Sequence, residues 1–278
     1  MKKLFDKVAY YSSRKTTQVY STSFSIGISM LKKKYQWPVY AIYGYVRFAD
    51  EIVDTFHACD KKLLLQKFRE DTYLALDQKI SMNPILHAFQ KTVNEYNISR
   101  ELIESFLHSM EMDLDQKEYD RAGYEEYILG SAEVVGLMCL KVFLDGDEEE
   151  YGYLTPYAMR LGAAYQKINF LRDLHADFQK LGRSYFPGID LSQLTGEQKM
   201  QIETEIESDF RAGEKGIRRL PRNVRLGVYL SFIYYYALFN KIRRMPAPQI
   251  LKERVRISNL RKYLLLLKAF FQFKLHLA

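Results

Sequence analysis

Four aspartates form two pairs, and within each pair the two residues stand four positions apart. Asp50 and Asp54 make the first pair, and Asp173 and Asp177 make the second, about 120 residues later. On an α-helix, positions i and i+4 lie on the same face, one turn apart. Each pair sits in an otherwise apolar segment, where a carboxylate is costly unless something neutralises it. Two such faces turned toward each other would bind Mg²⁺, whose usual ligands are carboxylate, water and phosphate oxygens.

Further polar residues extend the face of the first pair. Tyr43 and Arg47 precede Asp50 and Asp54 at steps of four, three and four, so all four share one helix face. The ordinary alternative is a surface ion pair between Arg47 and one of the two aspartates. The stretch 39–56 is too apolar for an exposed helix, however, and this favours a functional site.

The second pair belongs to a longer polar stripe. Gln166, Asn169, Asp173 and Asp177 follow one another at steps of three, four and four, which aligns them along about three helical turns. Such a stripe is also the solvent face of an ordinary amphipathic helix. Asp and Asn are poor residues for a helix interior, however. The two stripes together therefore predict a metal site.

Two short segments each leave two interpretations open. Ser21 and Ser23 lie in a segment with little charge. Their hydroxyls could cap a helix N-terminus or donate hydrogen bonds to phosphate oxygens, and capping is the stronger interpretation of the segment alone. Arg183 follows the second acid helix by a short turn, where its guanidinium could bind a diphosphate with two hydrogen bonds.

Small and aromatic residues also have two interpretations. Gly130, Ala132 and Gly136 would form a helix face of small residues. Such a face either allows close helix packing or leaves room for a long apolar ligand, and the sequence favours neither interpretation. The 22 Tyr and 17 Phe residues suit a large apolar cavity, or simply an aromatic-rich core. The five histidines show no metal-ligand spacing. Neither a Ser/His/Asp grouping, a zinc pattern, a Gly-rich phosphate loop nor a dinucleotide fingerprint occurs.

Composition predicts a folded, reduced protein. The chain has 278 residues, of which 47% are hydrophobic, so a sizeable core is expected. Cys59 and Cys139 make no disulfide framework, which favours a cytoplasmic location. The N-terminal residues form no apolar signal core. The longest nearly apolar run, 228–239, is too short to span a bilayer and is interpreted as a buried helix.

The net charge of +7 hides an asymmetry. From Arg211 onward there are 16 Lys and Arg against 2 Asp and Glu, which leaves 25 against 32 in the preceding residues. This predicts an anionic surface partner, with a solvated basic face as the equal alternative. Segment 260–274 mixes cations with apolar residues, so we expect peripheral contact with a membrane, at its inner face. A final core helix explains it at least as well. Nucleic acid is not expected, because no binding motif is present.

Helical periodicity dominates, and strand signals are scarce, so the sequence predicts an all-α protein. We expect one domain over residues 1–278, with the basic third, 211–278, as part of it. Proline-containing dipeptides are expected at helix starts or joints, namely at Pro38, Pro84, Pro156, Pro187, Pro246 and Pro248. The predicted helices cover residues 16–31, 37–57, 60–77, 84–95, 99–119, 123–144, 150–180, 196–219, 222–244 and 249–275.

Together these residues resemble the phytoene/squalene synthase family of head-to-head prenyl synthases, from about Tyr20 to Arg244. The matching positions occur in the family's order along the chain. They are Ser21, Ser23, Phe24, Arg47, Asp50, Asp54, Tyr127, Gly130, Gln166, Asn169, Arg172, Asp173, Asp177, Gly182, Arg183 and Tyr185.

The resemblance implies an isoprenoid synthase fold, with helices around a central apolar cavity, and two prenyl diphosphates as substrates. It implies Mg²⁺, with Mn²⁺ as a possible replacement, and no NADPH. The implied metal ligands are Asp50, Asp54, Asn169, Asp173 and Asp177. The implied substrate-binding residues are Ser21, Ser23, Phe24, Arg47, Gln166, Asn169, Arg172 and Arg183. The four aspartates, Tyr127 and Tyr235 are implied to be catalytic, with Tyr235 chosen from a run of three tyrosines.

The resemblance also gives an expectation about the product. The form of the first acid motif, Asp50-Glu51-Ile-Val-Asp54, is closer to phytoene synthases than to squalene synthases. We therefore expect condensation of two geranylgeranyl diphosphates to phytoene through a cyclopropyl diphosphate, in carotenoid biosynthesis. Ala176 departs from the family pattern, which commonly has an acid there. The alternatives are a squalene or dehydrosqualene synthase using farnesyl diphosphate and, more distantly, a non-catalytic helical scaffold at a membrane.

Overall fold

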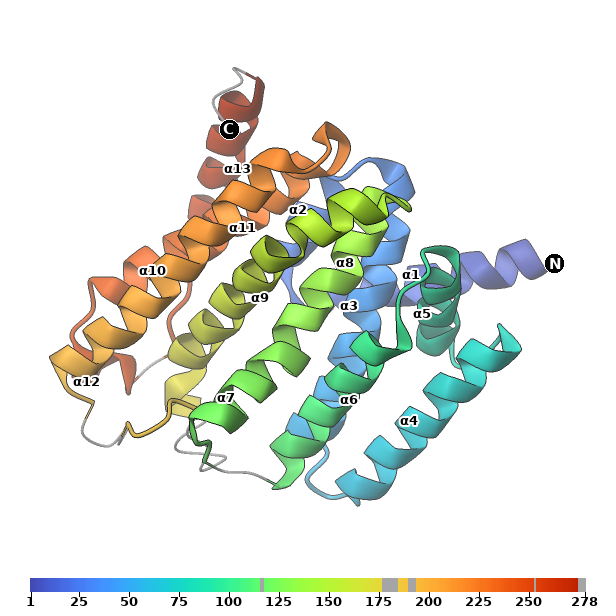
Figure 1. Ribbon diagram of the computed structural model, residues 1–278, viewed down its shortest axis with the longest axis horizontal. Coiled ribbons are helices and arrows are strands. Elements are labelled where there is room, and N and C mark those ends of the chain that lie inside the picture. Colours follow the sequence, from blue (N-terminus) through green and yellow to red (C-terminus); the bar gives the residue numbers. More distant parts are fainter. Residues whose placement is uncertain (116–117, 177–184, 190–193, 253, 275–278) are drawn as a thin grey trace.

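The computed structural model describes residues 1–115, 118–176, 185–189, 194–252 and 254–274 (Figure 1). Within these ranges the chain folds into helices joined by short turns and forms no β-strand, which confirms the all-α prediction. The helices are α1 (Lys2–Tyr20), α2 (Thr22–Ser29), α3 (Lys33–Asp54), α4 (Lys61–Gln78), α5 (Pro84–Glu95), α6 (Arg100–Asp115), α7 (Arg121–Ile128), the π-helix η1 (Leu129–Glu133), α8 (Val134–Leu144), α9 (Glu148–Ala176), α10 (Gly196–Arg219), α11 (Arg222–Arg243), α12 (Ala247–Ile250) and α13 (Asn259–Lys274).

Two helices have the bounds that their start signals predict. The Asn83 side chain accepts hydrogen bonds from the first backbone N–H groups of α5, and Pro84 occupies the first helical position. Thr195 and Gln198 form a reciprocal capping box at the start of α10. Both arrangements satisfy backbone donors that a helix start leaves without partners.

Other helix bounds were predicted wrongly. The helix predicted over 16–31 is two helices, because Ser21 has extended backbone angles of φ −144° and ψ 103°. The helix predicted from 37 begins at Lys33, so Pro38 lies inside α3 rather than at its start. Pro156 likewise lies inside α9. The last predicted helix, 249–275, is divided into α12 and α13 by a non-helical segment.

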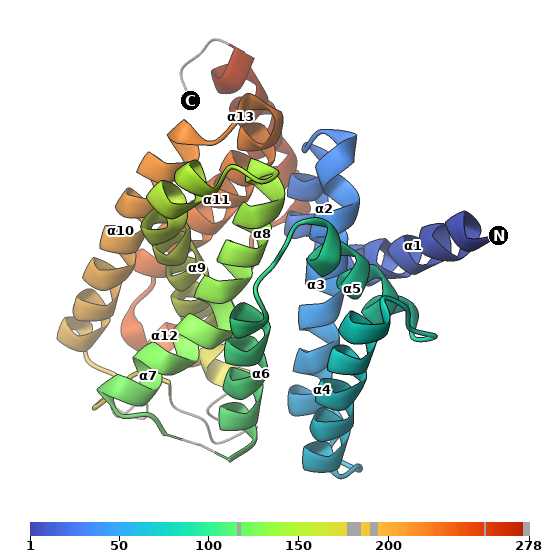
Figure 2. The same cartoon turned by 45° about the vertical axis from the view of Figure 1, so that its right-hand side comes forward.

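The long helices stand side by side in two groups (Figures 1 and 2). One cluster of buried residues lies mainly on helices α3, α4, α5, α6 and α8. The other lies mainly on helices α7, α9, α10, α11 and α12. Helix α9 packs on both α8 and α10, so it lies where the two groups meet. Helix α13 packs on the outer side of α11.

One helical stretch of the described residues, Arg121–Leu144, has the length and mean hydropathy of a membrane span. It comprises α7, η1 and α8, and half of its apolar window is buried within the protein. It packs against α6 and α9, as a core helix does. The prediction had named 228–239 as the longest nearly apolar run, and that segment lies in α11.

The π-helix η1 depends on a glycine at its contact with α6. A Cβ atom built on Gly130 would lie 2.4 Å from the backbone oxygen of Ser105 and 2.6 Å from Cβ of Ser109. Gly130→Ala should therefore lower stability by about 1–3 kcal/mol, because a close-packed contact must separate. Gly152→Ala in α9 is the matched control, since nothing lies within 4 Å of its added Cβ.

Thermal unfolding of the two variants checks this expectation. Gly152→Ala should melt at or above the temperature of the parent, because alanine is favoured over glycine in a helix by about 1 kcal/mol. Equal melting temperatures for Gly130→Ala and the parent would contradict the tight contact between η1 and α6.

Candidate functional site

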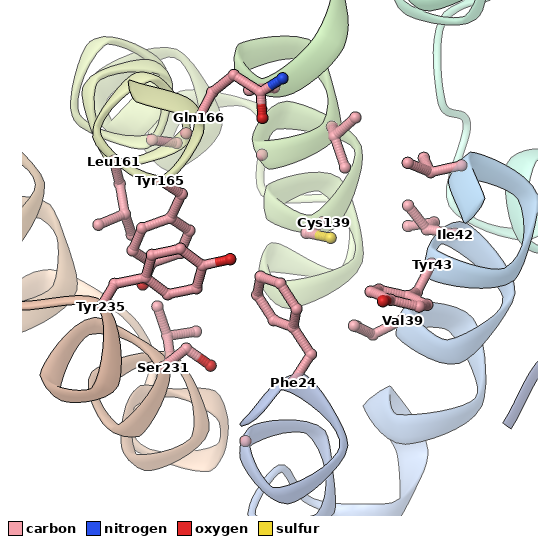
Figure 3. A pocket seen from close by; sticks show the side chains of 18 of the residues that line it. Phe24, Val39, Ile42, Tyr43, Cys139, Leu161, Tyr165, Gln166, Ser231 and Tyr235 are labelled. Atoms are coloured by element: carbon pink, nitrogen blue, oxygen red, sulfur yellow. The ribbon is translucent and has the colours of Figure 1, made fainter. Parts of the chain in front are cut away.

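A cavity of about 430 Å³ lies between α2, α3, α8, α9, α10 and α11. Side chains from α2, α3, α8, α9 and α11 converge on it (Figure 3). Polar residues line one end, namely Ser21, Arg47, Asp50, Gln166, Asn169, Arg172 and Arg254. Apolar residues line the other end, including Leu31, Leu140, Phe143, Leu154, Ile217 and Leu220. The cavity confirms the predicted arrangement of helices around an apolar centre.

The cavity is long as well as wide. Helix α9 lines it over the range from Leu154 to Arg172, and both Asn169 at the polar end and Leu154 at the apolar end belong to this lining. These residues are 15 positions apart. At about 1.5 Å per residue this separation corresponds to about 22 Å along the helix axis. The site therefore pairs one charged end with a deep apolar channel.

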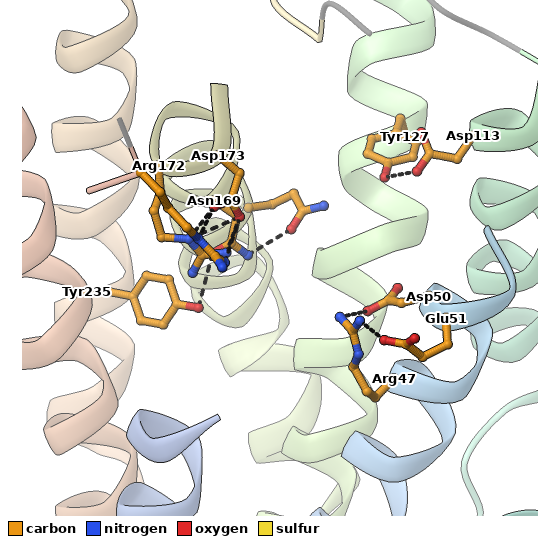
Figure 4. A network of polar contacts seen from close by, with 11 residues as sticks. Arg47, Asp50, Glu51, Asp113, Tyr127, Asn169, Arg172, Asp173 and Tyr235 are labelled. Carbon is orange, nitrogen blue, oxygen red and sulfur yellow. Dashed lines mark hydrogen bonds and ion pairs between the residues drawn. The ribbon is translucent and has the colours of Figure 1, made fainter. Parts of the chain in front are cut away.

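Helix α3 supplies the first polar wall (Figure 4). Arg47 pairs with Glu51 one turn later and lies 3.7 Å from an oxygen of Asp50. Its guanidinium also lies 4.4 Å from the ring centre of Tyr20. The ion pair proposed as the ordinary alternative is thus present, but both Arg47 and Asp50 line the cavity. Burial, together with the charge of Asp54, raises the pKa of Asp50 to about 7.

Helix α9 supplies the second polar wall (Figure 4). Gln166 donates to Ser131 Oγ at 3.2 Å and accepts from Asn169 at 3.2 Å. The Tyr235 hydroxyl donates to Asn169 Oδ1 at 3.2 Å. This chain of hydrogen bonds fixes a row of polar groups between η1, α9 and α11.

Two arginines hold Asp173 on the same wall. Arg172 Nε lies 3.1 Å from each carboxylate oxygen of Asp173. Arg254 Nε, from the segment between α12 and α13, lies 2.6 Å from Asp173 Oδ1. Both arginines line the cavity, so they concentrate positive charge at its polar end opposite the carboxylates of α3.

A third acidic group lies beside this end of the cavity. Asp113, on α6, is only 6% exposed and accepts hydrogen bonds from three tyrosine hydroxyls. The bonds come from Tyr119 at 3.3 Å, Tyr127 at 2.9 Å and Tyr185 at 3.2 Å. Among them Tyr127 lines the cavity. Asp113 therefore fixes the direction in which a cavity-lining hydroxyl points.

Aromatic rings form much of the cavity wall. Tyr165 and Tyr235 stack with ring centres 4.1 Å apart. Phe24 lies 5.6 Å from Tyr235 and 5.7 Å from Tyr43, so it bridges α11 and α3 across the cavity. Within the run of three tyrosines, the ring of Tyr235 lines the cavity. Tyr234 and Tyr236 instead bond to the Lys262 carbonyl and to Glu207.

The small residues of η1 and α8 face both a neighbouring helix and the cavity. A Cβ on Gly136 would lie 3.1 Å from the Ala158 backbone oxygen, so α8 and α9 pack closely there. Gly136 and Ala132 also line the cavity. Close helix packing is therefore present, and the same residues form part of the cavity wall.

The structure brings most of the predicted site residues to one cavity. Those that line it are Ser21, Phe24, Arg47, Asp50, Tyr127, Gln166, Asn169, Arg172 and Tyr235. Ser23, Asp54 and Asp173 are described but are not among the lining residues. Asp173 still contacts two of them, Arg172 and Arg254. Asp177 and Arg183 lie outside the described residues.

Ser21 has the cap role favoured from the sequence. Its hydroxyl oxygen accepts a hydrogen bond from the backbone N–H of Phe24 at 3.2 Å, at the start of α2. The residue also lines the cavity. Its position therefore leaves the hydroxyl near the polar end while the cap orients the first turn of α2.

Two residues of the site were not predicted. Asp113 is one of five acidic residues in α6 and has no acidic partner three or four positions away, and Arg254 is one of many cations in the basic third. Both reach the site only through tertiary packing. In the described part of the chain, no three His, Cys, Asp or Glu side chains are grouped closely enough to hold a metal.

Known proteins share this sequence pattern. The sequence model of the squalene/phytoene synthase family matches residues 17–261. Presqualene diphosphate synthase of Rhodopseudomonas palustris is 26% identical over 248 residues, covering 82% of this chain and 86% of that protein. Phytoene synthase of Arthrospira platensis is 23% identical over 263 residues, covering 85% and 84%.

A solved structure shares the fold. A dehydrosqualene synthase in complex with ligand superposes with a TM-score of 0.84 at 21% identity, covering 97% of this chain and 98% of that one. The architecture is therefore the all-α isoprenoid synthase fold. Since the family match also spans most of the chain, this protein belongs to the squalene/phytoene synthase family, whose members are prenyltransferases.

Proposed function

We propose that this protein condenses two molecules of geranylgeranyl diphosphate head to head into phytoene, through a cyclopropyl diphosphate intermediate and with release of diphosphate. The observation that carries the proposal is one cavity with two facing polar walls at one end and a deep apolar channel at the other. The charged end suits diphosphates and the channel suits their prenyl chains. The product would serve carotenoid biosynthesis.

The polar end supports ionisation of an allylic diphosphate. Arg47, Arg172 and Arg254 line it and can bind diphosphate oxygens. As the allylic C–O bond breaks, negative charge grows on the leaving diphosphate, and fixed cations stabilise that charge. The double bond of the second substrate then attacks the allylic cation, and loss of a proton closes the cyclopropane ring of the intermediate. A second ionisation releases the remaining diphosphate, and rearrangement with loss of another proton gives phytoene. Gln166 and Asn169 are positioned to orient the two substrates at this end.

The carboxylates support a role for Mg²⁺. The raised pKa of Asp50 marks a carboxylate whose charge is disfavoured by burial and by Asp54, and a divalent cation would favour its ionised form. Asp50 and Asp54 would hold the metal from α3, and Asn169, Asp173 and Asp177 would hold it from the second acid segment. Bound Mg²⁺, or Mn²⁺ in its place, would neutralise charge on the leaving diphosphate.

The aromatic wall supports carbocation chemistry. Phe24, Tyr43, Tyr165 and Tyr235 present rings to the cavity. Ring faces attract cations, by about 2 kcal/mol or more in a desolvated site. An apolar wall also keeps water away from a cation that it would otherwise trap.

The length of the channel supports the C20 substrate. The main chain of a geranylgeranyl group has fifteen carbon–carbon bonds, and a zigzag chain advances about 1.25 Å per bond, so the extended group reaches about 19 Å. The lining of α9 between Asn169 and Leu154 extends over about 22 Å. A farnesyl group, with eleven such bonds, reaches only about 14 Å and would leave more of the apolar end unfilled.

Product analysis tests the proposal. Purified protein is incubated with geranylgeranyl or farnesyl diphosphate and Mg²⁺, with and without NADPH. We expect a C40 product from the C20 substrate, independent of NADPH. A C30 product alone would contradict the choice of substrate and would favour squalene or dehydrosqualene synthesis. The absence of any condensation product with both substrates would contradict the proposed reaction.

Asp113 provides a test of the arrangement around Tyr127. Asp113→Asn keeps the size of the side chain but removes the charge that accepts three tyrosine hydroxyls. We expect kcat to fall about tenfold with little change in KM, because the hydroxyl of Tyr127 would lose the hydrogen bond that orients it, and small misplacements of such groups slow reactions by at least this factor. Steady-state rates for Asp113→Asn, Tyr127→Phe and the double variant check this.

If Asp113 acts through Tyr127, the double variant should be no slower than the slower single variant. Independent, multiplying effects would show that Asp113 does not act by positioning Tyr127. Melting temperatures serve as the control, since a general loss of packing would lower them in Asp113→Asn as well as reduce the rate.

A further inference from the structure

Helix α13 has two apolar faces. On its inner face Leu265, Leu266 and Ala269 pack against Leu230 and Tyr234 of α11. The Tyr234 hydroxyl also donates to the backbone carbonyl of Lys262 at 2.9 Å. The helix is thus fixed to the protein by one side, as expected for a final core helix.

The outer face of α13 is apolar as well. Its large side chains are between 54% and 72% exposed, and they are Leu260, Tyr263, Leu264, Leu267 and Phe271. Leu260, Leu264, Leu267 and Phe271 follow one another at steps of four, three and four and form one continuous stripe, and Tyr263 lies beside it. Single exposed apolar residues are common on proteins, but a contiguous exposed stripe marks an interaction surface.

The formal charge on α13 is entirely positive. Arg261 and Lys268 are exposed on α13, which contains no acidic residue. From Lys215 to the C-terminus the sequence holds a single acid, Glu253. An apolar stripe beside cations on one helix matches the boundary of an anionic bilayer, where apolar side chains enter the acyl region and cations meet the headgroups.

The stripe is close to the cavity in the fold. Helix α11 lines the cavity through Val228, Ser231 and Tyr235, while Leu230 and Tyr234 contact α13. One layer of helix therefore separates α13 from the cavity. Arg254 at the polar end precedes α13 by only a short segment. A bilayer beneath α13 would thus lie next to the chamber that receives long apolar chains.

We propose that the outer face of α13 docks this protein on the surface of an anionic phospholipid bilayer. The helix lies parallel to the membrane plane, with its leucine and aromatic side chains inserted and with Arg261 and Lys268 at the headgroups. The proposal concerns binding alone and stands apart from the choice of prenyl substrate.

Vesicle flotation tests the proposal without any substrate. The full-length protein is mixed with vesicles of equal parts phosphatidylglycerol and phosphatidylcholine, or of phosphatidylcholine alone, at low and high salt. We expect binding to the anionic vesicles and a decrease with salt, because ions screen exposed charges. Arg261→Gln and Lys268→Gln should each weaken binding about fivefold at low salt.

A charge-matched pair of variants tests the stripe. The double variant Leu264→Glu/Leu267→Glu should weaken partition about a hundredfold, from the lost burial of two leucines. Leu63→Glu/Leu74→Glu is the control, since these residues are 45% and 52% exposed on α4, remote from α13 in Figures 1 and 2. The control changes net charge equally and should bind like the parent.

Three results would overturn the proposal. They are failure of the parent to bind anionic vesicles at low salt, equal binding by the α13 and α4 variants, and a parent dimer that the α13 variant alone converts to a monomer. The last result would assign the stripe to a second copy of the chain. Condensation activity is measured separately, in detergent solution without vesicles. Failure of membrane binding would therefore leave the proposed reaction untouched, and failure of the reaction would leave the membrane proposal untouched.

Discussion

Asp50→Asn should reduce kcat at least about a thousandfold with either prenyl diphosphate, which corresponds to about 4 kcal/mol of transition-state stabilisation. Asp50 lines the polar end of the cavity, and asparagine retains its shape while removing its charge. The loss would fall on the ionisation step, where charge neutralisation at the leaving group contributes most. Single-turnover release of diphosphate from the first substrate measures this step directly.

The same substitution should not weaken the fold. The pKa of Asp50 is raised to about 7, so the folded state favours the protonated carboxyl. The protonated carboxyl of Asp50 contributes to the free energy of unfolding at low pH, and this contribution is lost as the pH rises through 7. Asp50→Asn removes that loss and should melt at or above the parent temperature at pH 8. An inactive but equally stable variant would place the effect in catalysis rather than in folding.

Asp71→Asn is the matched control, because Asp71 is exposed on α4, away from the cavity. It should retain the activity of the parent. If Asp50→Asn also kept activity within about threefold, the carboxylate pair would have no part in turnover. That result would contradict the catalytic and metal-binding roles proposed for Asp50, whereas a non-catalytic scaffold would show no condensation by the parent protein either.

Local signals explain why much of the fold was predictable from the sequence. Apolar periodicity located most of the long helices, and the Asn83-Pro84 and Thr195–Gln198 signals fixed two helix starts. The break at Ser21 was missed in the predicted helix bounds, although helix capping was the favoured interpretation of Ser21 and Ser23. The cap becomes decisive only when α2 must turn between α1 and α3. Helix α3 likewise begins at Lys33 rather than at Pro38. Packing of the helical turn before Pro38 outweighs the preference of proline for the first turn of a helix.

The candidate site was predictable where its residues repeat at helix spacing. The polar rows on α3 and α9 were found this way, and part of each row lines the cavity. Those lining residues are Tyr43, Arg47, Asp50, Gln166 and Asn169, whereas Asp54 and Asp173 are not among them. Asp113 and Arg254 lack such spacing, so their roles depend on contacts between distant segments. Arg254 reaches Asp173 across 81 positions of sequence. Nothing in the surrounding residues distinguishes it from the other cations of the basic third.

Arg254→Gln should lower kcat/KM about a hundredfold, or by about 2.7 kcal/mol. Removal of one fixed charge or donor from a site where negative charge develops has effects of this size. Arg254 lines the polar end of the cavity and contacts Asp173 through Nε at 2.6 Å. Arg254→Lys should recover part of the loss, because lysine restores the charge but not the two-pronged geometry of the guanidinium.

Arg256→Gln provides the control, since Arg256 is exposed and lies two residues further along the same segment. It should behave like the parent. Arg254 is 48% exposed on its side chain, and an ion pair with that exposure adds at most about 1 kcal/mol to stability. Unfolding should therefore change little in Arg254→Gln. A hundredfold fall in kcat/KM at unchanged melting temperature would assign Arg254 to substrate binding, whereas parallel losses of stability and rate would reduce it to a structural partner of Asp173.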